Sequence, residues 1–197
     1  NHGTAFNGAT TSRTGIDGSS ALFDGINDSI SLPSSIVSVG EQRTSRSFTL
    51  TFWFNPYRLT ALNGYNLISN QQPLLSGFKM MLINKINEGR GFIPVVSSVD
   101  SVPVGYDSVY IEQARTFPPI LFNNWNYFAL TYNGSAARIF INSKLAGTDN
   151  GFIFSSNSPY ILGGLVSPYS VFNGSIDQLI VYNRELNSSE INKSFES

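Results

Sequence analysis

The sequence predicts an all-β protein that folds as a two-sheet antiparallel β-sandwich with a short helical turn near its C-terminal end. Three observations lead to this fold class. Trp125–Gly147 has the composition and the turns of three short strands folded back on each other. Phe48–Asn55 places four large apolar side chains at every second position, which is the period of a strand. Elsewhere, many short apolar runs are separated by turn residues, as in sandwiches and jelly rolls.

The stretch Trp125–Gly147 predicts an antiparallel meander. Trp125–Tyr132 carries apolar or β-branched residues on both alternating faces, as a strand covered on two sides would. Asn133-Gly134 then predicts a type I′ hairpin turn, because both residues tolerate positive φ. Arg138–Asn142 alternates, and a second tight turn at Asn142-Ser143 leads into a third strand. Such a meander is marginal alone and needs a larger sheet to join.

Further strands are expected on both sides of the meander. They are predicted at Ala21–Phe23, Ser29–Leu32, Asn66–Ser69, Phe78–Ile86, Gly91–Ser97, Tyr160–Gly163 and Asn173–Asn183. The first twenty residues are rich in Gly, Ser, Thr and Asn and predict an N-terminal linker or tail. Residues 21–197 are therefore interpreted as one domain.

Two segments differ from this strand pattern. Ser98–Pro119 contains three prolines and scattered aromatic residues, and connections of this length are usually functional or carry a little structure of their own. We expect it to pack over a rim of one sheet. Asn187–Phe195 predicts one or two helical turns, because either Asn187 or Ser188 can serve as the N-cap and Glu190 follows close behind.

Composition excludes several classes of function. The chain has 12 basic and 13 acidic side chains, a formal net charge of −1, and only 13% charged residues, so a nucleic acid or an anionic membrane would meet no basic patch. Cysteine is absent, which excludes disulfides, a thiolate nucleophile and sulfur-ligated zinc. The one histidine, His2, leaves no histidine cluster elsewhere. No apolar run approaches the ~20 residues needed to cross a bilayer, so no membrane insertion is expected.

Four motifs occur in order along the chain. They are F-D-G-I-N-D at Phe23–Asp28, F-T-L-T-F-W-F-N-P at Phe48–Pro56, the meander at Trp125–Gly147, and F-N-G-S-I-D-Q-L-I-V-Y-N-R-E-L at Phe172–Leu186 with Ser189–Ile191 behind it. The ordered set resembles the concanavalin A-like, laminin G-type jelly-roll domains. The resemblance implies two stacked antiparallel sheets, one of them concave, that serve in glycan or protein recognition and often hold a calcium ion.

A calcium site is one interpretation of the acidic residues. The turn Asp24–Asp28 offers carboxylate, amide and carbonyl oxygens, which are hard ligands that suit Ca²⁺. Alternation places Asp177 on one face with two aliphatic residues, where an ionised carboxylate requires hydrogen bonds or a cation. In the resembling family the turn and this aspartate meet at one end of the sandwich. The structural calcium ligands implied are Asp24, Asn27, Asp28 and Asp177. The alternative is that the turn residues form Asx turns while Asp177 accepts backbone N–H groups.

Catalysis is not expected. β-Glucan hydrolases of the resembling fold carry an E-x-D-x-x-E strand motif that places two carboxylates on one face. This chain has Ile176-Asp177-Gln178 at the comparable place, without flanking glutamates. Polysaccharide lyases of the fold use Tyr or His with Arg and Gln, and no histidine is available. Sialidases and other glycosidases often carry such a domain as a non-catalytic appendage.

A glycan-binding surface requires aromatic rings and polar groups on one face. The candidate ligand-binding residues are Tyr65, Asn66, Asn84, Arg90, Tyr106, Tyr110 and Tyr169. For each of them, an ordinary half-buried loop or sheet position is the alternative. Trp53 and Trp125 lie in predicted central strands and are assigned to the core.

Two functional hypotheses remain. The first is a non-catalytic carbohydrate-binding (lectin-like) module that recognises a glycan or a cell-surface glycoprotein. The second is a protein–protein adhesion or structural domain of a surface protein or fibre, without sugar specificity. Low charge and abundant Ser, Thr and Asn favour an extracellular location on a cell or virion surface. The sequence begins at Asn1, which predicts an excised fragment, and any oligomer is expected to form through the parent protein.

Overall fold

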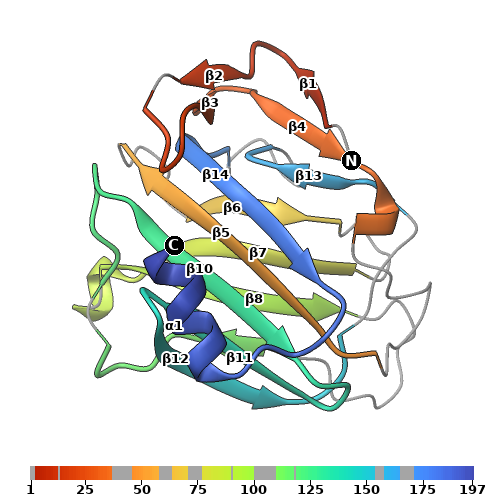
Figure 1. Ribbon diagram of the computed structural model, residues 1–197. Coiled ribbons are helices and arrows are strands. Elements are labelled where there is room, and N and C mark those ends of the chain that lie inside the picture. Colours follow the sequence, from red (N-terminus) through yellow and green to blue (C-terminus); the bar gives the residue numbers. More distant parts are fainter. Residues whose placement is uncertain are drawn as a thin grey trace.

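The protein is a sandwich of two seven-stranded sheets with one short helix against an outer face (Figure 1). The computed structural model describes residues 3–12, 14–36, 46–57, 64–70, 77–89, 91–99, 110–117, 119–153, 158–164 and 171–197. All strand pairs are antiparallel. The predicted fold class is therefore confirmed.

We name the two sheets A and B. Sheet A has the order β1-β4-β13-β6-β7-β8-β9, with β1 Thr4–Phe6, β4 Ser29–Leu32, β13 Tyr160–Leu162, β6 Gly64–Ser69, β7 Gly77–Asn84, β8 Phe92–Val99 and β9 Tyr110–Glu112. Sheet B has the order β12-β11-β10-β5-β14-β3-β2, with β12 Lys144–Asn150, β11 Ala136–Ile141, β10 Asn126–Tyr132, β5 Phe48–Pro56, β14 Asn173–Tyr182, β3 Ser20–Asp24 and β2 Thr10–Ser12. Two 3₁₀ turns, η1 Ser34–Ile36 and η2 Ile86–Glu88, and the helix α1 Ser188–Glu196 complete the elements.

All of the predicted strands are present, with ends that shift by a few residues. One prediction about an irregular segment is wrong. Part of the predicted N-terminal linker forms β1 and β2, which pair with β4 and β3 at one edge of each sheet. The described part of the long excursion contains β9, which is the other edge of sheet A, and this agrees with the expectation of a little structure at a rim of one sheet. Each of these strands has three residues, which is too short to show an alternating pattern.

The two turns of the meander differ in geometry. At the first turn Gly134 has positive φ (100°) but Asn133 does not, and Asn133 Oδ1 accepts the backbone N–H groups of Ser135 and Ala136 at 3.0 and 2.8 Å. The predicted type I′ turn is therefore absent there, because an Asx turn replaces it. At the second turn Asn142 and Ser143 both have positive φ (49° and 64°), as a type I′ turn requires.

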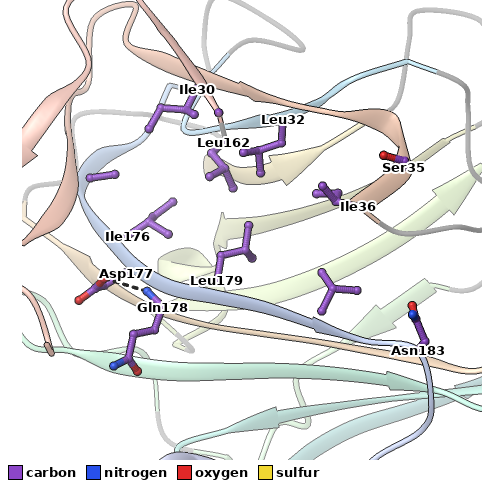
Figure 2. Close-up of a pocket in the computed structure, with 13 residues that line it drawn as sticks. Ile30, Leu32, Ser35, Ile36, Leu162, Ile176, Asp177, Gln178, Leu179 and Asn183 are labelled. Carbon is purple, nitrogen blue, oxygen red and sulfur yellow. Dashed lines mark hydrogen bonds between the residues drawn. The ribbon is translucent and has the colours of Figure 1, made fainter. Parts of the chain in front are cut away.

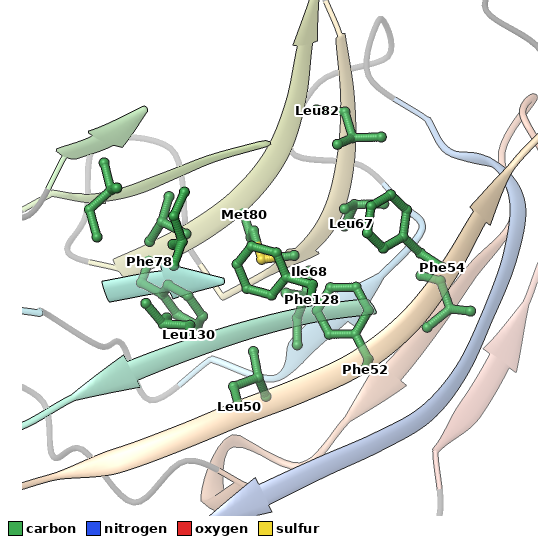
Figure 3. Close-up of a cluster of buried hydrophobic side chains, with 14 of the residues drawn as sticks. Leu50, Phe52, Phe54, Leu67, Ile68, Phe78, Met80, Leu82, Phe128 and Leu130 are labelled. Atoms are coloured by element: carbon green, nitrogen blue, oxygen red, sulfur yellow. The ribbon is translucent and has the colours of Figure 1, made fainter. Parts of the chain in front are cut away.

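The core lies between the sheets and is built largely from aromatic and long aliphatic side chains (Figure 3). The inner face of β5 contributes Phe52 and Phe54, and the neighbouring strand β10 contributes Phe128, whose ring stacks on Phe52 at 5.4 Å. Phe78 and Met80 of β7 meet them from sheet A. All five side chains have no exposed surface, so the alternating residues of β7 point out of the sandwich.

One side of the sandwich is closed by contacts between edge strands of different sheets. The backbone N–H of Tyr110 in β9 donates to the Asp149 carboxylate of β12 at 2.7 Å. Just beyond β9, the N–H of Ala114 donates to the Ala146 carbonyl of β12, also at 2.7 Å. These bonds join sheet A to sheet B and fix the position of β9.

Helix α1 covers part of the outer face of sheet B. Ile191 and Phe195 of the helix pack in a second cluster with Trp53 and Tyr127, and the Phe195 ring stacks on Trp53 at 5.4 Å. The prediction that Trp53 is a core residue is therefore wrong, because it lies half-buried on the outer face beneath the helix. Trp125 is also only half-buried, immediately before β10.

The helix begins with a capping box, and Asn187 is the one of the two predicted N-cap candidates that forms it. Asn187 Oδ1 accepts the Glu190 N–H at 3.0 Å, and the Glu190 carboxylate accepts the Asn187 N–H at 2.9 Å. Arg184 adds two hydrogen bonds to the same carboxylate, at 2.8 and 3.0 Å. The Arg184 guanidinium and the Asn187 amide together lower the pKa of Glu190 from 4.5 to about 2.

We predict that Phe195→Ala lowers the free energy of unfolding by about 1–3 kcal/mol, because it removes half-buried apolar surface from both Trp53 and Tyr127. Chemical denaturation monitored by tryptophan fluorescence measures this change. Phe6→Ala is the matched control, because Phe6 is 48% exposed on an edge strand and its loss should change stability by less than about 0.5 kcal/mol. Equal effects of the two substitutions would contradict the assigned role of α1.

A second prediction concerns pH. The pKa of Glu190 is lower in the folded protein than in the unfolded chain, so its contribution to stability is complete above about pH 4.5 and is lost as the pH falls towards 2. We expect Glu190→Gln to melt below the wild type at neutral pH. The difference in melting temperature should shrink between pH 4.5 and pH 2. A difference that stays constant across this range would show that the charge of Glu190 does not contribute.

Candidate functional site

The first predicted feature, the turn between β3 and β4, is held by its own carboxylates. Asp24 Oδ1 accepts the Ile26 N–H at 2.7 Å, and Asp28 Oδ2 accepts the Asp24 N–H at 2.9 Å. Asp28 is 4% exposed, and its Oδ1 has no hydrogen-bond partner within the described part of the chain. The turn of Gly8 packs beside this oxygen, because a Cβ added there would lie 3.0 Å from it. The turn therefore contains one buried carboxylate oxygen that still needs a partner.

Asp177 lies apart from this turn. Register pairs Asp24 with Asn173, and Asp177 is four residues further along β14, about 13 Å away at the rise of a strand. Its Oδ2 accepts the Ile16 N–H at 2.7 Å, and its Oδ1 accepts the Gln178 N–H at 2.8 Å. The predicted calcium site of Asp24, Asn27, Asp28 and Asp177 is therefore not assembled as one set. Asp177 follows the alternative, a carboxylate that accepts backbone N–H groups.

A bulge explains why the predicted face of Asp177 is also wrong. Gln178 has positive φ (48°), and the pairing of β14 with β5 shifts between Asp177 and Ile180. Asp177 consequently pairs with the outward-facing Trp53, whereas Val181 pairs with the inward-facing Leu50. Simple alternation does not survive such a bulge.

The predicted ligand-binding residues separate into three groups. Tyr65 is 2% exposed and lies in the core between Phe92 and Phe172, so its assignment to a binding surface is wrong. Asn84 is half-buried at the end of β7, where its Oδ1 accepts the Ile86 N–H at 3.0 Å. Asn66 and Tyr110 lie on the outer face of sheet A, as described below. Arg90, Tyr106 and Tyr169 fall outside the described residues.

The outer face of sheet A brings together polar side chains from four neighbouring strands. Ser69, Lys79 and Ser97 pair directly across β6, β7 and β8, and Tyr110 of β9 pairs with Ser97. Each of them is adjacent in sequence to a core residue. Because side chains alternate along a strand, this row faces away from the core. We call these four residues, with Asn66 diagonal to Lys79, the Lys79 face.

Lys79 is the unusual residue of this face. Its side chain is half-buried in the middle of the sheet, and no ion pair or hydrogen bond of its ammonium occurs within the described part of the chain. Burial lowers the pKa of Lys79. A buried charge normally has a partner. The ammonium is thus available to an external anion or acceptor.

Tyr110 and Asn66 supply two further kinds of contact. Tyr110 is 53% exposed at the edge of the sheet, so its ring is accessible. Asn66 is 1% exposed, and its Nδ2 donates to the Gly164 carbonyl at 2.9 Å. That bond fixes the orientation of the amide, and its Oδ1 is left without a hydrogen-bond partner among the described residues. The Lys79 face therefore combines a cation, the Ser97 hydroxyl and an exposed aromatic ring, whereas Ser69 and Asn66 are buried, each with 1% exposure.

A separate groove opens on the side of the sandwich opposite the β9–β12 contact (Figure 2). Pairing of β14 with β3 ends at Ile176, and beyond that point the second half of β14 borders a cavity of about 650 Å³. Aliphatic side chains from both sheets line it, including Leu32 of β4 and Leu179 and Val181 of β14. We call it the β14 groove, and its lining suits an apolar partner.

A third, smaller cleft of about 400 Å³ lies beside the start of α1. Its charged groups are already paired. Arg138 contacts Glu185 at 2.6 Å, and Arg184 contacts Glu190 at 2.8 Å. Because these charged side chains form ion pairs with each other, the residues that line the cleft are assigned a structural role.

Sequence reasoning missed Lys79 and Ser97. A signal for Lys79 existed, because Phe78–Asn84 alternates and the lysine stands at a position facing away from the core in a strand otherwise apolar. Aromatic and amide residues were considered as sugar contacts, and a mid-strand lysine was not. Ser97 carried no comparable signal.

The comparisons with known proteins agree with this architecture. The sequence model of the concanavalin A-like lectin/glucanases superfamily matches residues 24–192. The chain therefore belongs to that superfamily. No sequence among the curated proteins matches it. Among the described residues, no helix has both the length and the apolar character that a membrane crossing requires.

Solved structures with the same fold come from several kinds of protein. Domain 4 of AbnA, a GH43 extracellular arabinanase from Geobacillus stearothermophilus in complex with arabinotriose, has a TM-score of 0.69 and 20% identity, over 97% of this chain and 86% of that one. The binding domain of Paraclostridial Mosquitocidal Protein 1 has a TM-score of 0.71 and 21% identity, over 98% of this chain but only 47% of that one. The Trypanosoma rangeli sialidase in complex with the inhibitor DANA has a TM-score of 0.59 and 15% identity, over 96% and 29%. At these identities the likeness shows the fold alone.

We predict that Asp177→Ala lowers the free energy of unfolding by about 1–3 kcal/mol, because the N–H groups of Ile16 and Gln178 lose a charged acceptor. Urea denaturation of the variant measures the loss. The same loss is expected with calcium present and with EDTA, since these oxygens are already occupied by amides. A loss that disappears in EDTA would instead assign Asp177 to a metal.

Proposed function

We propose that this protein is a non-catalytic carbohydrate-binding module of a secreted or surface-exposed protein. The observation that carries the proposal is the Lys79 face, where one sheet surface presents a half-buried ammonium, the half-buried Ser97 hydroxyl and an accessible tyrosine ring. Sugars are recognised by such a combination, because a ring stacks on the C–H face of the sugar and polar groups bind its hydroxyls. Membership of a superfamily that includes lectins supports this assignment.

The placement of the face on a sheet strengthens the proposal. Ser69, Lys79 and Ser97 are on adjacent, fully paired strands, so the backbone beneath them is rigid. Tyr110 is held at the edge through the bond from its N–H to Asp149. A preorganised surface loses little conformational entropy when it binds a ligand. The sheet would therefore hold these groups in position before a glycan arrives.

The second candidate function is protein–protein adhesion without sugar specificity. The β14 groove favours it, because its lining is aliphatic and it borders a strand that is unpaired on one side beyond Ile176. A protein segment with apolar side chains fits this surface better than a sugar does. Substitutions in the groove and on the Lys79 face distinguish the two functions.

We also propose a structural calcium ion at the β3–β4 turn. The support is the buried Asp28 Oδ1, which has no hydrogen-bond partner within the described residues, together with the carbonyl groups of the turn. Asp24 would be a neighbouring ligand, whereas Asp177 is excluded by its distance along β14. No group of three or more acidic or histidine side chains occurs in the described residues, so backbone oxygens would have to complete the coordination.

The glycan proposal predicts that Tyr110→Ala weakens binding on a glycan array by about tenfold, since loss of one stacking ring removes about 1 kcal/mol or more. Phe6→Ala is the matched control, because Phe6 is a comparably exposed aromatic residue (48%) at the opposite edge of the same sheet. Absence of binding to any glycan, combined with capture of a protein partner that Leu179→Ser abolishes, would favour adhesion instead.

The calcium proposal predicts that the melting temperature rises with free calcium. The stabilisation should follow RT ln(1 + [Ca²⁺]/Kd), about 2.7 kcal/mol at a hundredfold excess over Kd. Asp28→Asn should remove the dependence on calcium, because it neutralises the carboxylate and keeps one acceptor oxygen for the Asp24 N–H. Asp177→Ala should lose stability but keep the dependence. A melting temperature that ignores both calcium and EDTA in the wild type would rule the ion out.

A further inference from the structure

The Lys79 face has a property that a surface for neutral sugars does not need. An ammonium group is half-buried in the middle of a sheet, and no counter-ion for it occurs among the described residues. Neutral glycans are bound well by hydroxyl and amide groups, which are less costly to desolvate than a charge. The presence of a lysine at this position therefore requires a separate explanation.

The neighbours of Lys79 do not neutralise it. Its partners across the strands are the hydroxyl residues Ser69 and Ser97, and Val95 and Asn66 lie diagonally to it. Among the described residues, the nearest acidic residue on this face is Glu112, which is opposite Val95 and one strand further away. Burial lowers the pKa of Lys79. Within the described part of the chain, the positive charge of Lys79 thus has no acidic partner.

We propose that the Lys79 face recognises the oxyanion of an acidic glycan, a carboxylate or a sulfate, with Lys79 as the residue that determines charge specificity. The inference rests on the proposed carbohydrate-binding function and narrows its ligand class. The anion would lie over β7 and β8 against the Lys79 ammonium, with Ser97 as a hydroxyl donor. The sugar ring would extend towards the edge of the sheet, where the Tyr110 ring is exposed.

The balance of desolvation explains how this arrangement selects for charge. A neutral ligand that covers Lys79 would remove its remaining water and return only weak hydrogen bonds. An anion restores the lost hydration energy through a charge-assisted hydrogen bond, which is roughly twice as strong as a neutral one. The same residue therefore favours acidic ligands and disfavours neutral ones, which is the usual form of specificity.

The direct test measures the lysine itself. Nuclear magnetic resonance of the protein with ¹³C-labelled lysine follows the Cε signal of Lys79 during titration with glucuronate, with its neutral methyl ester, and with sulfate at constant ionic strength. We expect a saturable change at Lys79 with glucuronate but not with the ester, and an increase in the pKa of Lys79 on binding. The exposed Lys144 on the edge strand β12 is the internal control. A Lys79 signal that moves no more than that of Lys144 with either anion would overturn the proposal.

Variants connect this result to glycan binding and separate the carboxylate from the sulfate. On an array of neutral, carboxylated and sulfated glycans, Lys79→Gln should weaken binding of the acidic glycans about ten- to a hundredfold, and Lys79→Arg should retain most of it. Lys144→Gln should have no effect. Binding confined to neutral glycans and unchanged in Lys79→Gln would overturn this inference while the carbohydrate-binding function stands. A saturable sulfate response at Lys79 without binding of any glycan would instead overturn the carbohydrate-binding function and leave the oxyanion site.

Discussion

The arrangement of the two layers depends on the two faces of strand β5. Its inner face places Phe52 and Phe54 in the core, where Phe52 stacks on Phe128 of the neighbouring strand. Its outer face carries Thr49 and Trp53, and these hold the C-terminal segment: the Thr49 hydroxyl bonds the Arg184 carbonyl and the Leu186 N–H, both at 2.9 Å, and Trp53 stacks under the helix. Because strand side chains alternate, a slip of one residue would exchange these faces and disrupt both clusters. The register of β5 therefore fixes β10 and β14 on either side of it.

The elements that could be predicted were those whose own residues show a recognisable sequence pattern. The long central strands show a clear period of two, and the helix is marked by Asn187 and Glu190, so both were found from the sequence. The edge strands β1, β2 and β9 have three residues each and pair on one side only within their sheets. Their conformation is decided by the strands they join, which lie 20 or more residues away for β1 and β4. Local pattern cannot supply that information.

The candidate site was only partly predictable, because it depends on which face each residue occupies. Tyr65 and Asn66 are adjacent on β6 and point to opposite faces, so Tyr65 lies in the core and Asn66 faces outward. The bulge at Gln178 separates Asp177 from the face that alternation predicts. Bulges have weak sequence signals, and one of them reverses every later assignment on the strand. Tyr110 was identified as a candidate from its residue type and its place in a long connection, and the structure exposes it on the edge of sheet A.

The two outer faces of the sandwich differ in a way that bears on function. On sheet B, helix α1 covers the aromatic pair of Trp53 and Tyr127, so the apolar surface of this outer face is buried by the chain itself. On sheet A, the half-buried charge of Lys79 has no ion-pair partner in the described part of the chain, and burial lowers its pKa. An unpaired, partly desolvated ammonium lowers the stability of the folded state, and an uncharged side chain of similar length would avoid that loss. A group that reduces stability in the free protein contributes most when a ligand supplies its partner, because the energy lost on folding is then recovered on binding. Sheet A, rather than sheet B, is therefore the face on which an incoming acidic group gains the most.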